Sequence, residues 1–246
     1  MSTLAKGLAV LRSFGEQRAT MTLSEVAALT DLSRAAARRV LRTLTALGYV
    51  VQQGREFSLA PRILELGFAY LSTQSWIDRA EPQMKALSQS MDESVSAAIL
   101  QDTEIVYVAR MPAPYRILST TITVGTRLPA FHTSLGRVQL GFLTQDDLWR
   151  RLQSITVRPY TPATITDRAA LVERIEADHA QGFSIVDEEL EQGLRSVAVP
   201  IVTRAGQNLG AINLSSHAVR MTRNEMRERV VPRLFEIRDE IRQAFI

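Results

Sequence analysis

The fold of the first part of this chain is decided by LSEVAALTDLSRAAARRVLRTLTALGYV, residues 23–50. Thr22 directly precedes the stretch, and Glu25, within it, lies three positions after Thr22. This spacing is typical of a capping box at the start of a helix. Residues 30–32, TDL, suit a short turn, and Ser33 is a good N-cap for the next helix. Two short helices joined by so tight a turn predict a helix-turn-helix motif.

The second of these helices, residues 33–47, has two different faces. At 100° per residue its small and apolar side chains share one arc, whereas four arginines occupy another. A face of guanidinium groups can contact bases and phosphates in the major groove of DNA. These arginines are Arg34, Arg38, Arg39 and Arg42. We expect Arg39, at the edge of the arc, to be structural, either packing on its neighbours or pairing with Glu25 or Asp31, rather than contacting DNA.

Elements on both sides of this motif complete a DNA-binding domain. A first helix is predicted by the helical spacing of Leu4, Leu8, Leu11 and Phe14. Gly48 suits a left-handed C-cap, and residues 49–59 alternate as a strand pair around Gln53-Gly54, with Arg55 near the tip. We therefore expect a winged helix-turn-helix over residues 1–60. Its expected DNA contacts are Thr22, Ser33, Arg34, Ala35, Arg38, Arg42 and Arg55.

The positive charge of the chain is concentrated in this region. The net charge of all 246 residues is +3, whereas residues 1–60 hold eight Lys or Arg and four Asp or Glu, a balance of +4. Between Ser33 and Arg55 there are five arginines and no acidic residue. An arginine face alone is often only solvated, but its combination with a turn, a cap and a wing favours double-stranded DNA as a partner.

The composition excludes several other classes of protein. With 46% hydrophobic and 22% charged residues, the chain is typical of a soluble globular protein. No apolar run reaches the roughly 20 residues that span a bilayer, and the N-terminus lacks a signal-peptide pattern, so we expect a cytoplasmic protein without a membrane partner. There is no cysteine and there are only three histidines, so we expect neither a metal site nor a cofactor.

A linker and a larger domain follow the first sixty residues. Pro61 and the apolar residues of PRILELGFAYL predict a linker helix in residues 61–75, with an exposed stripe suited to contact between two copies. In residues 76–246, strands are expected at 95–100, 104–110, 117–124, 183–187, 197–202 and 209–215. Helices are expected at 76–91, 134–143, 146–152, 168–181 and 222–244. Hairpin signals at 101–102 and 205–208 favour antiparallel pairing, and hence an α+β fold.

Six blocks of sequence occur in a recognisable order: KGLAVLRSF (6–14), the stretch 23–50, PRILELG (61–67), LPAFHTSLGRVQL (128–140), GFSIVDEELEQGLRSVAVPI (182–201) and GAINLSSHAVR (210–220). Along essentially its whole length the chain thereby resembles the IclR family of bacterial transcription regulators. The resemblance implies a winged helix-turn-helix, a linker helix and a GAF-like effector domain, in homodimers or homotetramers that often govern catabolic operons. The amino-acid sequences of the later blocks are most similar to those of the branch that controls aromatic-acid catabolism through the β-ketoadipate (protocatechuate) pathway.

By this resemblance the effector lies between the sheet and the turn at residues 133–136. The residues carried over are Ser134, Leu135, Ser196, Asn213 and Ser215. Free N–H groups at the helix start favour an anion such as a carboxylate, which is the effector that we expect.

Four further residues were considered for the same site. Arg110 and His132 could add charge-assisted hydrogen bonds. Asp187 or Glu189 could accept a ligand hydroxyl, or could instead orient Arg195. Structural alternatives remain, because polar residues on strands often serve only neighbouring backbone groups and a run of acidic residues is often solvated.

Two other functions remain open. An enzyme acting on a small acid would use His132, Ser134 and Asp187 as a hydrolytic triad. However, the chain lacks a G-x-S-x-G motif, and Ser134 lies only two residues from His132. In an architectural DNA-binding protein, the second domain would serve only for oligomerisation. The sequence favours a ligand-responsive transcription regulator, either repressor or activator, that is not an enzyme.

Overall fold

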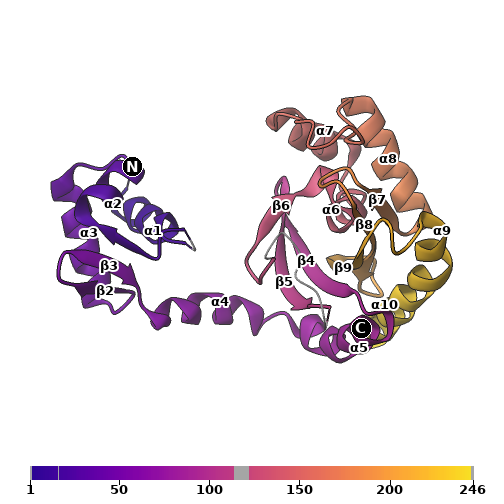
Figure 1. The fold of residues 1–246 in the computed structure, drawn as a ribbon, viewed down its shortest axis with the longest axis horizontal. Helices are drawn as coiled ribbons and strands as arrows, with labels where there is room; N and C mark the ends of the chain where they lie inside the picture. Colours follow the sequence, from indigo (N-terminus) through magenta and orange to yellow (C-terminus); the bar gives the residue numbers. More distant parts are fainter. Residues whose placement is uncertain (1, 16, 114–121, 245–246) are drawn as a thin grey trace. The chain divides into compact units, whose positions relative to one another are not determined.

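The computed structural model of the chain describes residues 2–15, 17–113 and 122–244 (Figure 1). Its contacts divide the chain into two compact units, Met1–Thr73 and Gln74–Ile246. Each unit has a hydrophobic core and a sheet of its own. No helix of the described ranges is both long and apolar enough to cross a membrane.

The first unit is a helix-turn-helix with a small antiparallel sheet, in the order β1-β3-β2. Its elements are α1 (Thr3–Ser13), β1 (Thr20–Thr22), α2 (Leu23–Leu29), α3 (Arg34–Ala46), β2 (Val50–Gln53), β3 (Glu56–Leu59), η1 (Pro61–Ile63) and α4 (Leu64–Leu71). The hairpin of β2 and β3 is the predicted wing (Figure 1). The predicted winged helix-turn-helix is therefore confirmed.

Local chemistry sets the ends of its helices. Thr22 and Glu25 form the predicted capping box, in which the Thr22 Oγ1 accepts the Glu25 N–H and the Glu25 carboxylate accepts the Thr22 N–H at 2.7 Å. Asp31 in the turn has a φ of 52°, a left-handed conformation that aspartate adopts more readily than most residues. Gly48, with a φ of 78°, follows the end of α3, as expected.

The core of the first unit is smaller than its apolar patterns suggest. It consists of Val10, Phe14, Met21, Val26, Val40, Leu41, Leu44, Val50 and Phe57. Of the stripe that predicts α1, Phe14 is buried and Leu11 partly buried, whereas Leu4 and Leu8 are exposed. The apolar face of α1 is thus only half used within the unit.

The second unit is a six-stranded antiparallel sheet with helices on both faces, in the strand order β6-β5-β4-β9-β8-β7. Its strands are β4 (Ser94–Gln101), β5 (Glu104–Met111), β6 (Arg127–Pro129), β7 (Ser184–Asp187), β8 (Leu194–Val202) and β9 (Asn208–His217). Its helices are α5 (Ser75–Met91), η2 (Ala130–His132), α6 (Ser134–Leu140), α7 (Gln145–Ser154), α8 (Arg168–Gln181), α9 (Arg223–Glu225), the π-helical turn η3 (Met226–Val230) and α10 (Val231–Ala244). The predicted α+β class is confirmed.

Side chains alternate between the two faces of this sheet. Along β9, Ala211 joins the core cluster that includes residues of α6, whereas the next residue back, Gly210, faces Trp76 of α5. A Cβ atom on Gly210 would lie 2.6 Å from the Trp76 ring, so the glycine lets α5 approach the sheet closely. Helices α5 and α10 lie together at one side of the unit (Figure 1).

An equally close approach positions α6. A Cβ atom on Gly136 would lie 2.1 Å from the carbonyl oxygen of Ala130, so the start of α6 packs directly on the backbone of η2. Thr133 lies between the two and caps α6, accepting the Gly136 N–H at 3.1 Å. This contact places His132 and Ser134 on one side of α6, next to the sheet.

A bulge in β5 changes which side chains face α6. Ala97 pairs with Ala109 and Ala98 with Tyr107, so Val108 is an extra residue in β5. In a regular strand Tyr107 and Arg110 would point to opposite faces, because they are three positions apart. The bulge brings both to the same face.

Four expectations for the second unit need correction. Of the strand expected at 117–124, positions 117–121 lie outside the described residues and positions 122–124 are not in a strand. Strand β6 was not expected. Strand β8 begins at Leu194, three residues before the expected start at residue 197. Helix α6 ends at Leu140 because Gly141 and a turn follow it, and the helix expected at 222–244 contains the π-helical turn η3.

Candidate DNA-binding face and effector cavity

Helix α3 presents an arginine-lined concave surface. Its lining residues are Arg34, Ala35, Arg38, Arg39, Arg42 and Thr43, all exposed. None of the four arginines makes an ion pair with any part of the chain that the structure describes. Their positive charge is therefore available to an external anion such as DNA phosphate.

Arg39 departs in part from its expected role. It lies on this concave surface with the other arginines, and no ion pair joins it to Glu25 or Asp31 in the described ranges. Glu25 is used instead by the capping box with Thr22. The expected ion pair of Arg39 is therefore absent from the described residues. The packing alternative is not contradicted, because Arg39 also lines a cleft with Thr3, Lys6 and Gly7 of α1.

The remaining predicted DNA contacts differ in whether they already have a structural role within the chain. Thr22 is engaged in the capping box, and the Ser33 Oγ accepts the Ala36 N–H at 3.2 Å as the N-cap of α3. Both therefore have a structural role in placing the helices. Ala35 is exposed on the first turn of α3, and Arg55 is exposed beside the turn of the wing.

The second unit encloses a cavity of about 300 Å³ between the sheet, the start of α6 and the segment that joins β7 to β8. Its lining residues are Tyr107, Arg110, Ile122, Leu128, His132, Thr133, Ser134, Leu135, Val186, Leu190, Glu191, Gln192, Gly193, Leu194, Ser196, Asn213, Ser215 and His217. Seven of the eight predicted effector residues are among them. A cavity of this size suits a small molecule with few polar groups.

Asp187 is the predicted effector residue that does not line the cavity. Its carboxylate accepts two hydrogen bonds from Arg195, at 2.7 and 3.1 Å, and Arg195 also donates to the carbonyl oxygens of Ala218 and Met221. Of the two roles considered for Asp187, the structure supports orientation of Arg195. This pair joins β7 and β8 to the turn after β9.

Arg110 supplies the positive charge of the cavity. Its guanidinium nitrogens lie 3.4 Å from the Oγ atoms of Ser96 and Ser94, so the group lies over β4. Burial lowers the pKa of Arg110, and no carboxylate in the described ranges forms an ion pair with it. Ser96 pairs in the sheet with Asn213, so the cation lies next to the polar side chains of β9.

The polar atoms of the sheet face are only partly satisfied. The Oγ atoms of Ser134 and Ser196 are 2.9 Å apart and share a hydrogen bond. The Asn213 Nδ2 donates to the Ser215 Oγ at 3.0 Å, but the buried Asn213 Oδ1 has no hydrogen-bond partner among the described residues. Since buried acceptors are normally satisfied, this oxygen is a candidate acceptor for a donor from outside the described residues.

His132 is a second buried group of this kind. It is 1% exposed, and neither ring nitrogen has a hydrogen-bond partner within residues 2–15, 17–113 and 122–244. Its ring packs edge-on against Tyr160, with 5.3 Å between centroids. Burial, assisted by the positive charge of Arg137, lowers the pKa of His132 to about 4. At neutral pH the imidazole is therefore uncharged and offers one donor and one acceptor.

One of the N–H groups expected to be free at the start of α6 is already used. The helix has seven residues, and the Thr133 side chain takes the Gly136 N–H. Anion binding at this helix start stays a prediction. Arg110 is the arginine among the residues that line the cavity.

The hydrolytic triad considered above is not assembled. The Ser134 Oγ bonds to Ser196, and Asp187 pairs with Arg195. The nitrogens of His132 form no hydrogen bond with Ser134, Asp187 or any other described residue. No group of three potential His, Asp or Glu metal ligands occurs in the part of the chain that the structure describes.

Sequence reasoning missed the wall that closes the cavity. Residues 190–194 line it, and Glu189 is 7% exposed, although the acidic run there suggested solvated surface. The available signal was apolar Leu190 and Leu194 on either side of Gly193, whose φ of 78° needs glycine. Tyr107 was missed because the bulge in β5 breaks the alternation.

An arginine-faced winged helix-turn-helix, with a polar cavity in a separate unit, defines a ligand-responsive DNA-binding transcription regulator. The profile of the IclR helix-turn-helix domain matches residues 3–54, and that of the bacterial transcriptional regulator IclR C-terminal region matches residues 68–242. The chain belongs to the IclR family, as its sequence blocks predicted.

Individual relatives agree with this assignment. The chain is 40% identical to the Pca regulon regulatory protein of Pseudomonas putida, over all of this chain and 84% of that protein. It superimposes on the crystal structure of a protein from Rhodococcus sp. RHA1, described as a transcriptional regulator, with a TM-score of 0.87, 44% identity and coverage of 100% and 98%. It also matches the inducer-binding domain of a double mutant of PobR from Acinetobacter, in complex with 3-hydroxybenzoic acid, with a TM-score of 0.63, 28% identity and coverage of 66% and 95%.

The uncharged, buried His132 predicts a pH dependence of stability. Its pKa is about 4 in the folded protein and 6.5 ordinarily, so the unfolded chain binds more protons between these values. The resulting stability is present above pH 6.5 and is lost as the pH falls toward 4. From pH 7 to pH 5, we expect His132 to lower the free energy of unfolding by about 2 kcal/mol. Urea unfolding should show this loss in wild type and not in His132→Gln.

The control for this measurement is His179→Gln, which replaces an exposed histidine. It should keep the loss found in wild type. Equal losses in wild type and His132→Gln would contradict the prediction.

Proposed function

We propose that the protein regulates a catabolic operon for aromatic acids, binding its operator through α3 and the wing and a small hydroxylated carboxylate in the cavity. The observation that carries the effector class is the combination of Arg110 and the buried Asn213 Oδ1, because within the described residues the first has no ion pair and the second no hydrogen-bond partner. A carboxylate satisfies the first by charge, and a hydroxyl donor satisfies the second.

The walls of the cavity favour an aromatic body between these polar groups. Tyr107, Leu128 and Leu135 offer apolar contact, and His132 can bond to a ring hydroxyl in either direction. The likeness to the Pca regulon regulator and to a domain bound to 3-hydroxybenzoic acid supports the same class. The expected effectors are therefore hydroxybenzoates or acids derived from them, such as β-ketoadipate.

The same proposal implies a cytoplasmic location and a role without catalysis. An operator in bacterial DNA places its action in the cytoplasm. Ser134 and His132 bind and orient the effector, and no chemical step is assigned to them, because the serine hydroxyl bonds to Ser196 and not to the histidine. The repressor or activator role depends on where the operator lies relative to the promoter.

We further propose that two copies pair through α4, within the linker of residues 61–75. Leu64 and Phe68 are each 71% exposed, and with Leu71 they share one face of the helix. A second copy of the same helix can cover this apolar face, which would give a homodimer or a tetramer built from dimers. A two-fold dimer presents two α3 helices to a two-fold operator.

For DNA binding, we expect Arg38→Ala to weaken operator affinity and to reduce its salt dependence. Each lost phosphate contact should lower the slope of log K against log salt concentration by about 0.9. Fluorescence-anisotropy titrations at several salt concentrations measure this slope. Arg39→Ala should behave in the same way, because Arg39 lies on the same concave surface.

The matched control is Arg150→Ala, which removes an exposed arginine charge from the second unit, where it pairs with Asp147. It should leave the slope at its wild-type value. Wild-type affinity of Arg38→Ala at two salt concentrations would refute the role of this residue. Absence of specific binding by the wild-type protein would refute the proposed function itself.

For the effector, we expect Ser196→Val to weaken binding of 4-hydroxybenzoate, protocatechuate or β-ketoadipate, whichever binds wild type. The change removes the hydroxyl that bonds to Ser134, and about a tenfold loss of affinity corresponds to one lost polar contact. Calorimetry measures the affinity, and anisotropy should show unchanged DNA binding without effector. Thr203→Val, after the end of β8 and outside the cavity, is the isosteric control.

The outcomes for the effector separate two ideas. Unchanged effector affinity in Ser196→Val would remove this residue from the site. Wild-type protein that binds its operator but none of these acids would show that the proposed effector class is wrong.

For the dimer, we expect Phe68→Glu to shift the protein toward monomer, since a buried carboxylate in the paired face is unfavourable. Sedimentation equilibrium should show this shift, together with weaker operator binding. Val219→Glu, at an exposed valine of the second unit, should leave both unchanged. Monomeric wild type at micromolar concentration, or an unchanged Phe68→Glu dimer, would contradict the pairing.

A further inference from the structure

The segment that closes the effector cavity is a preformed loop, residues 188–193, here called the cavity loop. Residues 190–193 line the cavity, and Glu188 and Gly193 at its two ends have left-handed φ values of 59° and 78°. The Glu188 carboxylate accepts the Gly193 N–H at 2.8 Å, and the Glu188 N–H donates to the carbonyl of Leu194. Hydrogen bonds therefore join the two ends of the loop, so that the loop can move as a rigid unit.

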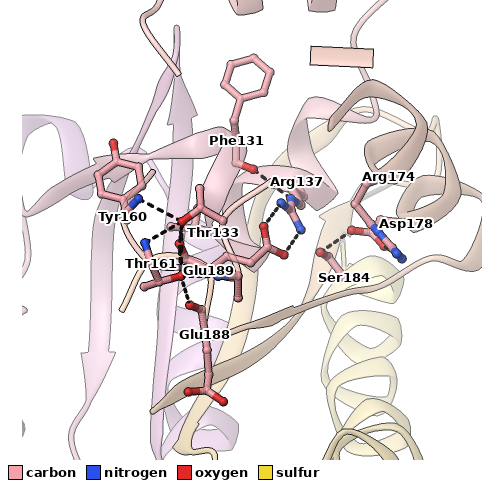
Figure 2. Close-up of polar contacts among 12 residues, drawn as sticks. Phe131, Thr133, Arg137, Tyr160, Thr161, Arg174, Asp178, Ser184, Glu188 and Glu189 are labelled. Carbon is pink, nitrogen blue, oxygen red and sulfur yellow. Dashed lines mark hydrogen bonds and ion pairs between the residues drawn. The ribbon is translucent and has the colours of Figure 1, made fainter. Parts of the chain in front are cut away.

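One side chain holds this loop from inside the protein. Arg137 of α6 is fully buried and donates to both oxygens of Glu189, at 2.8 and 2.5 Å (Figure 2). Its Nε donates to the carbonyl oxygen of Phe131 in η2 at 2.9 Å. A single guanidinium thus joins three parts of the cavity wall: α6, the backbone beside His132 and the cavity loop.

The other attachments of the loop are weaker. The hydroxyls of Thr161 and Thr164 donate to the carbonyl oxygens of Glu188 and Glu189, each at 2.6 Å. These are neutral hydrogen bonds, whereas the Arg137–Glu189 contact is bidentate and charged on both sides. At the far end the Ala218 N–H donates to the Gly193 carbonyl at 2.7 Å. The Arg137–Glu189 contact is therefore the strongest of these four attachments of the loop to residues that the structure describes.

We infer that Arg137 is a positioning residue for the effector: through Glu189 it holds the cavity loop closed, so that a ligand enters and leaves only when this ion pair opens. Arg137 is not among the residues that line the cavity, so we assign it no direct contact with the effector. It acts through the loop and through the backbone of η2. The inference rests on the proposed effector function and adds how that site is kept shut.

Buried ion pairs are not retained for stability alone, because two apolar residues of similar size often serve as well. The geometry here gives a second reason. The loop carries four acidic or amide side chains, Glu188, Glu189, Glu191 and Gln192, which water would solvate readily in an open loop. A charged anchor offsets this tendency and returns the loop to the same closed position each time.

The inference is tested with Glu189→Gln, which removes the charge and keeps the shape. Hydrogen exchange followed by mass spectrometry should show about tenfold faster exchange of the loop amides of Glu188, Gly193 and Leu194 in the effector-free protein. With 4-hydroxybenzoate as probe, the dissociation rate should rise by a similar factor. DNA affinity without the probe should stay at its wild-type value.

The matched control is Asp178→Asn. Asp178 is a buried carboxylate of the same polar cluster, but it bonds to Ser184 and Gln181 and not to the cavity loop (Figure 2). It should leave both the exchange of the loop and the dissociation of the probe unchanged. A general loosening of the domain would affect both variants alike.

A second variant covers the case in which Glu189→Gln fails to fold with an unpaired buried arginine. Arg137→Met combined with Glu189→Met replaces both charges by apolar groups and should retain the fold. It should show the same fast exchange in the loop. Wild-type exchange in a folded variant, or equal acceleration in Asp178→Asn, would overturn the inference. If wild type binds none of the acids, the proposed effector class fails, while loop exchange still decides whether Arg137 holds the loop.

Discussion

The second unit depends on how closely α6 approaches the backbone around it. Gly136 lies against the Ala130 carbonyl with no room for a side chain, and the Gln139 amide bonds to the Leu100 N–H and the Ala98 carbonyl of β4. The short helix is therefore fixed both to η2 and to the sheet. Because His132, Ser134 and Leu135 lie on either side of this contact, the cavity inherits its shape from it. A larger residue at 136 would move one wall of the site as a whole.

The features that the sequence predicted best are helix ends and turns that depend on only a few neighbouring residues. The capping box of Thr22, the turn at Asp31 and the end of α3 at Gly48 are each decided by local backbone chemistry, and all were predicted. Seven cavity residues were also expected, in large part from the family resemblance, and the structure brings them together. Whether they bind an effector remains a prediction.

What was missed depends on contacts between distant parts of the chain. Nothing near Glu189 indicates that an arginine 52 residues earlier will bury it. The bulge at Val108 likewise follows from how β4 and β5 pair, and it reverses the face of Arg110 relative to Tyr107. The expected pair of Arg39 with Glu25 is not formed because the capping box holds this carboxylate, and the preferred partner could be identified only with the two helices in place.

The hydrogen bond between Ser134 and Ser196 has a consequence for how selective the cavity can be. Either hydroxyl can be the donor at the 2.9 Å separation, so rotation of two light hydrogens reverses the polarity of the pair while every heavier atom stays in place. A keto oxygen and a phenol can then be accommodated at the same point with little reorganisation. Discrimination among related acids must come from the rigid features around the pair, namely the volume of the chamber and the fixed cation at Arg110. For the effector class proposed above, this geometry favours selection by molecular outline over selection by oxidation state.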